Sequence, residues 1–395
     1  MKRLFSCLLV LAAIGCGDSK AVATGHATTA APWRRGWKYP SRAGRSMRQK
    51  QVSEMKMLSV PLVRAERGEG AVLAMIRFLC LLVIALHACA DFASAQESQE
   101  EKLLTRIKQP PTYVRNENYE QKWFDTVKAG IDKARDYLGN YGPVQVYIIG
   151  QQSDELEDPK IGQAIVEAFC RRRHLNSRDR ITDCLKGSGA SLIERARDGS
   201  TEAYLSYVDY TDPPFAELVF INPHGFPFPY LYTRGIHEYT HVFQRAFPRT
   251  PTWMTEGGAE FLAFYLGGRN KWVDFDQSMN QSMRMVQSVG DDAMMKDFED
   301  VEKLEKEQPE LKKYYRHLAY DAGVWAVAFA IHRSKSRSVK AYTKRFYPMV
   351  GRLGWQQALS RYANVRDTSE FYQRFQQFLD QPIGVQMKML EELKP

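Results

Sequence analysis

Cysteine is scarce in most of this 395-residue sequence. Four of its six cysteines lie in or beside apolar stretches before residue 95, which leaves Cys170 and Cys184 for the rest of the chain. Their spacing is not that of a CxxC pair, and three arginines adjoin Cys170, so the pattern does not favour a zinc site built from thiolates. If the chain is exported, the pair forms either one disulfide or two free buried thiols, and the sequence leaves both open.

Net charge is also missing from most of the chain. The formal charge of the whole sequence is +9. Residues 1–95 hold 14 of the 55 Lys and Arg residues and 5 of the 46 Asp and Glu residues, so residues 96–395 hold 41 of each and carry no net charge. A nucleic-acid-binding domain needs a basic surface, and the sequence contains neither a C2H2 zinc-finger pattern nor a basic helix. We therefore expect no nucleic acid as a partner.

Two segments near the N-terminus are typical of export signals. Residues 1–16 place two basic residues before an apolar run that ends in Gly-Cys, and they resemble a bacterial lipoprotein leader. A second segment begins at Met75, has an apolar core at residues 78–90 and ends in a small-residue cleavage site before Gln96. An apolar helix of that length spans about 20 Å, short of the roughly 30 Å of a bilayer core. The sequence therefore predicts a signal peptide at residues 75–95 rather than a transmembrane helix.

The stretch between the two leaders shows no sustained period of 3.6 or 2 residues, and we predict no fold in it. Two interpretations are open. Either translation starts at Met75 and residues 1–74 do not belong to the protein, or the protein is a lipoprotein tethered to a membrane through Cys16. Both place the protein outside the cytoplasm, in the periplasm or the extracellular space. Only the second anchors it to the cell envelope.

From Gln96 onward, the periodicities predict an α+β fold. Residues 96–229 combine helical patterns with stretches of alternating apolar residues. The helical patterns are at 119–138, 161–172 and 190–197, and the strand patterns are at 143–149, 203–210 and 216–221. After a loop rich in proline and aromatic residues, residues 230–395 are helical in pattern nearly throughout. We expect residues 216–221 to form an exposed edge strand, which could bind an extended peptide by β-augmentation.

The pentapeptide HEYTH at residues 237–241 carries the first chemical pattern. In a helix, residues four apart lie on one face, so His237 and His241 can bind the same metal ion while Glu238 projects beside them. Two ligands and a general base are the elements of metal-assisted hydrolysis. The alternative is a pair of surface histidines.

A second helical pattern follows and offers a third ligand, Glu256, with fourteen residues between it and His241. Catalytic zinc sites have three protein ligands and an open fourth position. Glu256 can supply the third ligand after a helix reversal through Pro248 and Pro251, and Glu260 lies one turn further on the same helix face. Glu260 could accept the other ring N–H of a ligating histidine. The alternative for Glu256 is an exposed glutamate that the helix dipole favours near a helix start.

Together these residues resemble a known family. HEYTH followed by WMTEGGAEF at residues 253–261 is similar to the gluzincin, or peptidase MA-like, pattern of HExxH followed by W-x-x-E-G-x-A, which zinc aminopeptidases share with many bacterial exported proteins. The resemblance covers about residues 200–380 and implies a zincin-type helical half that carries the active-site helix. It also implies zinc ligands at His237, His241 and Glu256, a catalytic base at Glu238, and at Glu260 the outer carboxylate of thermolysin-like enzymes.

The segment YDAG at residues 320–323 is similar to the Y-E-K-G segment that carries the transition-state tyrosine of zinc aminopeptidases. The resemblance implies that Tyr320 donates a hydrogen bond to the developing oxyanion, with Gly323 permitting a close helix approach. The match departs at Ala322, so a core tyrosine is an open alternative, and His317 is a rival donor. The sequence has no G-x-M-E-N segment, and aminopeptidase specificity is therefore not implied.

These patterns predict an exported zinc metallopeptidase with one Zn²⁺ per chain and a peptide or protein as substrate. Two alternatives keep the same fold. One is a catalytically silent zinc-binding scaffold, and the other is a non-peptidase amide hydrolase of the cell envelope. Substrate preference and oligomeric state are not encoded in any pattern found in the sequence.

Overall fold

The structure is a computed structural model, and it describes residues 102–150, 154–175, 177–208, 211–228, 230–290 and 293–393. The leader segments at residues 1–16 and 75–95 lie outside the described residues, together with Cys16 and Met75. From Lys102 onward the described chain forms one compact unit.

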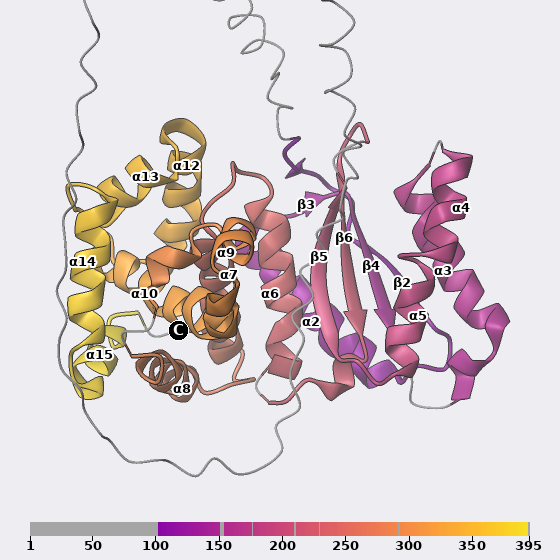
Figure 1. The fold of residues 1–395 in the computed structure, drawn as a ribbon, viewed down its shortest axis with the longest axis horizontal. Helices are drawn as coiled ribbons and strands as arrows, with labels where there is room; N and C mark the ends of the chain where they lie inside the picture. The colour runs from indigo at the N-terminus through magenta and orange to yellow at the C-terminus, as the bar shows by residue number, and fades with distance from the viewer. Residues whose placement is uncertain are drawn as a thin grey trace, which may run out of the picture. The chain divides into compact units, whose positions relative to one another are not determined.

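A four-stranded mixed sheet forms the centre of the first half (Figure 1). Its strand order is β2 (Thr112–Arg115), β4 (Val144–Ile149), β6 (Phe215–Ile221) and β5 (Glu202–Val208). The first three strands run parallel, and β5 pairs with β6 in antiparallel register through a short connection. A separate two-stranded ribbon joins β1 (Thr105–Arg106) to β3 (Tyr141–Gly142).

Helices cover both faces of this sheet (Figure 1). Because side chains alternate along a strand, β4 sends Val146 and Ile148 to one face and Tyr147 and Ile149 to the other. The first face packs against α2 (Gln121–Leu138) and α6 (Tyr230–Gln244), and the second against α3 (Pro159–Arg173), α4 (Arg178–Lys186) and α5 (Ala190–Arg197). Strands buried on both faces are typical of parallel sheets.

The prediction that residues 216–221 form an exposed edge strand is wrong. Strand β6 lies between β4 and β5, and every one of its residues is buried. The misleading feature is Glu217, which looked like the exposed half of an alternating pattern but is buried against Arg173 of α3. Within the described part of the chain, the strands at the two ends of the sheet are β2 and β5.

The second half of the chain is helical and begins with α7 (Thr252–Arg269), which packs against α6. The helices that follow are α8 (Phe275–Gln287), α9 (Val301–Glu307), α10 (Gly323–Arg333), α11 (Val339–Ala341), α12 (Tyr347–Leu353), α13 (Trp355–Tyr362), α14 (Thr368–Leu379) and α15 (Ile383–Leu390). The 3-10 turns are η1 (Asp154–Glu157), η2 (Pro223–Gly225), η3 (Met295–Phe298) and η4 (Pro309–Tyr314), and the π-helical turns are η5 (Arg316–Ala322) and η6 (Tyr342–Phe346).

Within the described unit, helix α6 lies between the sheet layer and the helical half (Figure 1). Its residues from Thr233 to Gln244 are buried. It approaches α2 closely because both helices have a glycine at the crossing: a Cβ atom on Gly235 would lie 2.4 Å from the carbonyl oxygen of Val127, and one on Gly130 would lie 2.9 Å from the Cα atom of Gly235. A helix held this firmly on several sides is a rigid support for functional side chains.

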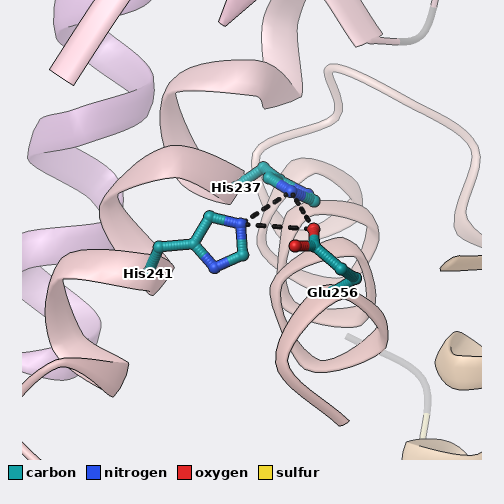
Figure 2. A group of neighbouring side chains, drawn as sticks. All are labelled: His237, His241 and Glu256. Atoms are coloured by element: carbon teal, nitrogen blue, oxygen red, sulfur yellow. Dashed lines mark hydrogen bonds and ion pairs between the residues drawn. The ribbon is translucent and has the colours of Figure 1, made fainter. Parts of the chain in front are cut away.

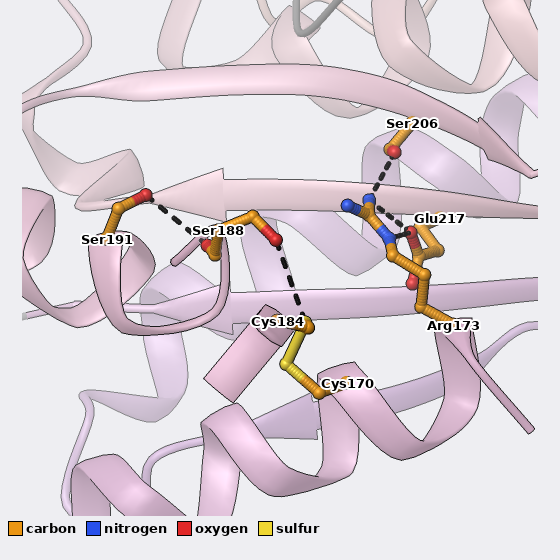
Figure 3. The surroundings of a disulfide bond; sticks show 7 residues. All are labelled: Cys170, Arg173, Cys184, Ser188, Ser191, Ser206 and Glu217. Atoms are coloured by element: carbon orange, nitrogen blue, oxygen red, sulfur yellow. Dashed lines mark hydrogen bonds and ion pairs between the residues drawn. A yellow bond between two sulfur atoms is a disulfide. The ribbon is translucent and has the colours of Figure 1, made fainter. Parts of the chain in front are cut away.

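A disulfide joins Cys170 of α3 to Cys184 of α4 in the outer layer of helices (Figure 3). This settles the choice that the sequence left open between a bond and two free thiols. Nearby, Arg173 at the end of α3 donates to Glu217 of β6 and to Ser206 of β5. The disulfide and this ion pair fasten the outer helices to one another and to the sheet.

The α+β fold class predicted from the sequence is confirmed, and most elements lie where the periodicities placed them. Helix α4 was not predicted, because its nine residues are strongly polar and too few to show a clear period. No helix within the described ranges is both long enough and apolar enough to cross a membrane.

Candidate metal centre

Two histidines on α6 point toward one glutamate on α7 (Figure 2). His237 and His241 lie one turn apart, and their Nε2 atoms are 3.1 Å from each other. Oε2 of Glu256 lies 3.5 Å from Nε2 of His237 and 3.4 Å from Nε2 of His241. In the part of the chain that the structure describes, these are the three residues whose possible ligand atoms lie within 4.8 Å of one another.

The spacing of these three atoms fits a small tetrahedral cation. Zinc binds imidazole nitrogen and carboxylate oxygen at about 2.0–2.2 Å, so two ligand atoms of a tetrahedral site are about 3.3–3.5 Å apart. The three observed separations lie close to that range. The donor set also matches, because two neutral imidazoles and one carboxylate are typical ligands of catalytic zinc.

Glu256 has the properties of a ligand rather than of a surface residue. It is buried in the first turns of α7, and its Oε2 atom has no hydrogen-bond partner among the described residues. Burial by itself would raise the pKa of Glu256, but His241 and His237 lower it well below its usual value. Burial would likewise lower the pKa of His241, and Glu256 instead raises it to about 9. The carboxylate of Glu256 and the imidazole of His241 therefore stabilise each other's charged forms.

Each histidine ring is fixed from behind by a second residue. Nδ1 of His237 lies 2.7 Å from Oε2 of Glu260, and Nδ1 of His241 lies 2.8 Å from Oε1 of Gln244. The amide nitrogen of Gln244 in turn donates to the carbonyl oxygen of Thr255 and to the hydroxyl of Tyr347. Such outer contacts direct Nε2 of each ring toward the metal position. Glu260 lies where the sequence suggested, whereas Gln244 was missed.

Two arginines surround Glu260. Nη2 of Arg316 donates to Oε1 of Glu260 at 3.0 Å, and Nη2 of Arg234 lies 3.8 Å from Oε2. Burial would raise the pKa of Glu260, but the charges of Arg316 and Arg234 lower it far below its usual value. Glu260 is therefore ionised and accepts the ring proton of His237. Sequence reasoning missed both arginines, although Arg234 precedes His237 by one helical turn.

Glu238 follows His237 directly in α6, and its charge acts on His241, but it is not one of the three converging residues. It is buried, and its Oε1 atom is 3.8 Å from Nη1 of Arg234, four residues earlier on α6. A residue next to His237 in a helix is turned from it by about 100°. The arrangement separates two kinds of carboxylate: Glu256 faces the histidine nitrogens, and Glu238 remains free of them.

Tyr320 lies against the cluster. Its ring stacks on the ring of His237 with 5.8 Å between centroids and 7° between planes. Burial raises the pKa of Tyr320 well above its usual value, and the charge of Glu256 adds to this, so the phenol keeps its proton. His317, the rival donor, is partly exposed, its Nδ1 atom has no partner among the described residues, and the structure records no contact between it and the metal cluster.

Two glycines allow Tyr320 to reach this place. A Cβ atom on Gly323 would lie 2.4 Å from the carbonyl oxygen of Trp253, and one on Gly257 would lie 2.1 Å from the carbonyl carbon of Gly323. Any larger residue at either position would separate η5 and α10 from α7. The π-helical turn η5, which carries Tyr320, is a geometry often found at functional sites.

The other histidines among the described residues do not join the cluster. His224 contacts the hydroxyl of Tyr119 through Nδ1 at 3.0 Å, and Nε2 of His332 lies 3.8 Å from Glu392. His174 follows the end of α3 in the outer helical layer.

In comparisons with known proteins, no family model, no curated protein and no solved structure matches this chain. The chemistry of the cluster therefore has to carry the functional argument.

Proposed function

We propose that the protein is a zinc-dependent metallopeptidase that hydrolyses peptide bonds of an extracytoplasmic substrate. The observation that carries the proposal is the convergence of three buried side chains. His237, His241 and Glu256 place three donor atoms at the spacing of a tetrahedral zinc site, and the buried Glu238 follows His237 directly in the same helix. The resemblance of HEYTH and WMTEGGAEF to the gluzincin pattern agrees with this assignment.

Each side chain then has a defined task in hydrolysis. Zinc, when bound, supplies Lewis acidity that activates a water molecule and polarises the carbonyl group of the substrate. Glu238 accepts the proton of the attacking water and passes it to the leaving amine. Tyr320, which stays protonated, donates a hydrogen bond to the carbonyl oxygen as negative charge develops on it. Glu260 and Gln244 keep the two imidazoles oriented throughout.

Strand β5 is a candidate support for the substrate. It is the last strand of the sheet on the side beyond β6, and no further strand pairs with it among the described residues. Its neighbours in the fold include α6, which carries the metal-binding histidines. An extended peptide could add to this edge through main-chain hydrogen bonds. We therefore propose β5, rather than residues 216–221, as the strand that binds the peptide.

Three rival functions make different predictions. A catalytically silent scaffold would bind zinc without turnover, yet the base Glu238 is present. A non-peptidase amide hydrolase of the cell envelope would use the same residues on another amide. A nucleic-acid-binding role is disfavoured because residues 96–395 carry no net charge. The first two are separated by substrate tests on the zinc-loaded full chain, offered a peptide library in parallel with cell-wall amides.

Metal content gives the first direct test. We expect about one zinc ion per chain after metal-replete purification, because three donors converge on one point. Glu256→Gln should release zinc at much lower chelator concentrations, since a neutral amide oxygen is a weaker ligand than a carboxylate. Elemental analysis and chelator competition measure both. Absence of zinc from the wild type would refute the proposal, and unchanged affinity in the variant would transfer the third ligand to another residue.

A further inference from the structure

Arg316 contacts both Tyr320 and the carboxylate that orients His237. Its Nη2 atom donates to Oε1 of Glu260 on α7 and to the hydroxyl of Tyr230 on α6, both at 3.0 Å. Its guanidinium carbon also lies 4.5 Å from the centre of the Tyr320 ring. One side chain on η5 therefore contacts both helices that carry the metal donors.

These contacts close a ring of four residues. Glu260 bonds to Nδ1 of His237, the His237 ring stacks on Tyr320, Tyr320 lies under the guanidinium of Arg316, and Arg316 returns to Glu260. A closed ring of contacts restricts each member more than an open chain does, because moving one residue strains two neighbours. Its members come from three separate elements: α6, α7 and η5.

We propose that Arg316 is a positioning residue that connects Tyr320 to Glu260, so that one side chain sets both the metal affinity and the placement of the oxyanion donor. The inference rests on the proposed function. The first effect concerns the orientation of the His237 ring and requires a bound metal ion but no catalysis, whereas the second effect also requires catalysis.

The physical argument for the metal effect is the burial of Glu260. The side chain of Glu260 is 1% exposed, and Arg316 is the closest cation to it, while Arg234 stands 3.8 Å away. Without Arg316, Oε1 of Glu260 loses its hydrogen-bond donor, and the carboxylate is free to turn away from Nδ1 of His237. Outer partners that orient a ligating histidine typically contribute 10–100-fold to metal affinity.

The argument for the Tyr320 effect is the shape of the guanidinium. A planar guanidinium can lie flat over an aromatic ring while its edge donates to two acceptors, and a lysine ammonium cannot do both. Arg316 and Tyr320 are four residues apart on the same turn, so the arginine also fixes the turn that carries the tyrosine. Replacing Arg316 by Lys should therefore keep the charge near Glu260 but release Tyr320.

Arg234 supplies a matched control. It is a second arginine beside Glu260, and its guanidinium lies over the rings of Phe226 and Tyr230, whereas only its charge acts on Tyr320. Its other carboxylate neighbour is Glu238. A change at Arg234 should therefore affect activity through the base and independently of Tyr320.

The test is a double-mutant cycle in the full chain, with zinc affinity measured by chelator competition and kcat measured at saturating zinc. We expect Arg316→Met to weaken zinc binding by about 10–100-fold and Arg316→Lys to stay within about threefold of the wild type. At saturating zinc, both variants should lose at least about tenfold in kcat, but less than threefold when Tyr320→Phe is already present. Arg234→Met should lower kcat by the same factor with or without Tyr320→Phe.

The outcomes separate this inference from the proposed function. If the wild type binds zinc but cleaves no substrate, the peptidase proposal fails, and the zinc affinities of the Arg316 variants still decide the metal effect. If Arg316→Met binds zinc as tightly as the wild type, or if the losses in kcat at Arg316 and Tyr320 multiply independently, the positioning role is wrong even in an active enzyme. Arg316→Lys keeps the test valid should the Met variant fold poorly.

Discussion

Two buried glutamates, Glu217 in the sheet and Glu260 in the helical half, both pair with an arginine, but their pKa values shift in opposite directions. Glu217 of β6 accepts two hydrogen bonds from Arg173 on one oxygen, and its other oxygen has no partner within the described chain. Burial therefore dominates and raises the pKa of Glu217. Glu260 has partners on both oxygens and two arginines nearby, and its pKa falls.

The contrast shows what turns a buried ion pair into part of a site. The contacts of Glu217 end in the sheet and α3, where they fasten the outer layer of helices (Figure 3). The contacts of Glu260 continue to His237 and from there to the metal position. An arginine–carboxylate pair therefore gains a functional role when the carboxylate also contacts a residue of the site. Burial of the pair does not by itself give it such a role.

The largest effect is expected from Glu238→Gln. Glutamine keeps the shape of the side chain and removes the base, so hydrolysis should fall by at least 10²- to 10⁴-fold, the usual contribution of general-base catalysis. Zinc content and circular dichroism should stay unchanged, because Glu238 is not one of the converging donors. Equal cleavage of a responsive substrate by variant and wild type would reject the mechanism, whatever metal is bound.

Tyr320→Phe should have the next largest effect. The variant keeps the ring that stacks on His237 and loses only the hydroxyl, so zinc affinity should not change. Activity should fall by about 10²- to 10³-fold, as for loss of one oxyanion donor. His317→Ala is the companion variant. A larger loss from His317→Ala than from Tyr320→Phe would assign the donor role to His317.

The comparison of the two glutamates is tested directly by Glu260→Gln and Glu217→Gln. Glu260→Gln should weaken zinc binding by about 10–100-fold, because the amide no longer orients the His237 ring through a charged acceptor. Glu217→Gln should leave zinc affinity unchanged, since its contacts do not reach the cluster. Chelator competition on the two proteins measures both. Similar affinities in the two variants would remove the distinction.

The smallest effect concerns stability and pH. Because the pKa of Glu217 is raised in the folded protein above its ordinary value of 4.5, the unfolded chain releases this proton first as pH rises. The folded state therefore loses stability between pH 4.5 and the raised pKa, by at most about 1.4 kcal/mol per pH unit. Denaturant unfolding at several pH values should show this slope in the wild type relative to Glu217→Gln. The same dependence of the unfolding free energy on pH in the wild type and the variant would contradict the raised pKa of Glu217.

Local sequence patterns were sufficient for most of the fold. Helix α2 and strand β4 lie within a few residues of their predicted ranges, because the period of apolar residues reports which face is buried. The same reasoning failed for residues 216–221, because alternation does not distinguish an edge strand from an inner strand whose polar residue is paired. Only the partner of Glu217, forty-four residues earlier in the chain, reveals its burial.

Spacing within a single helix also determined much of the candidate site. The four-residue interval between His237 and His241, and that between Glu256 and Glu260, places each pair on one face of its own helix. What the sequence could not decide is which side chains meet across helices: Gln244 behind His241, Arg316 beside Glu260, and Tyr320 on His237. Helical periodicity indicates which face of its helix a residue occupies. The residues that it contacts on other helices depend on how those helices cross, and the crossing is determined only by the packing of the whole core.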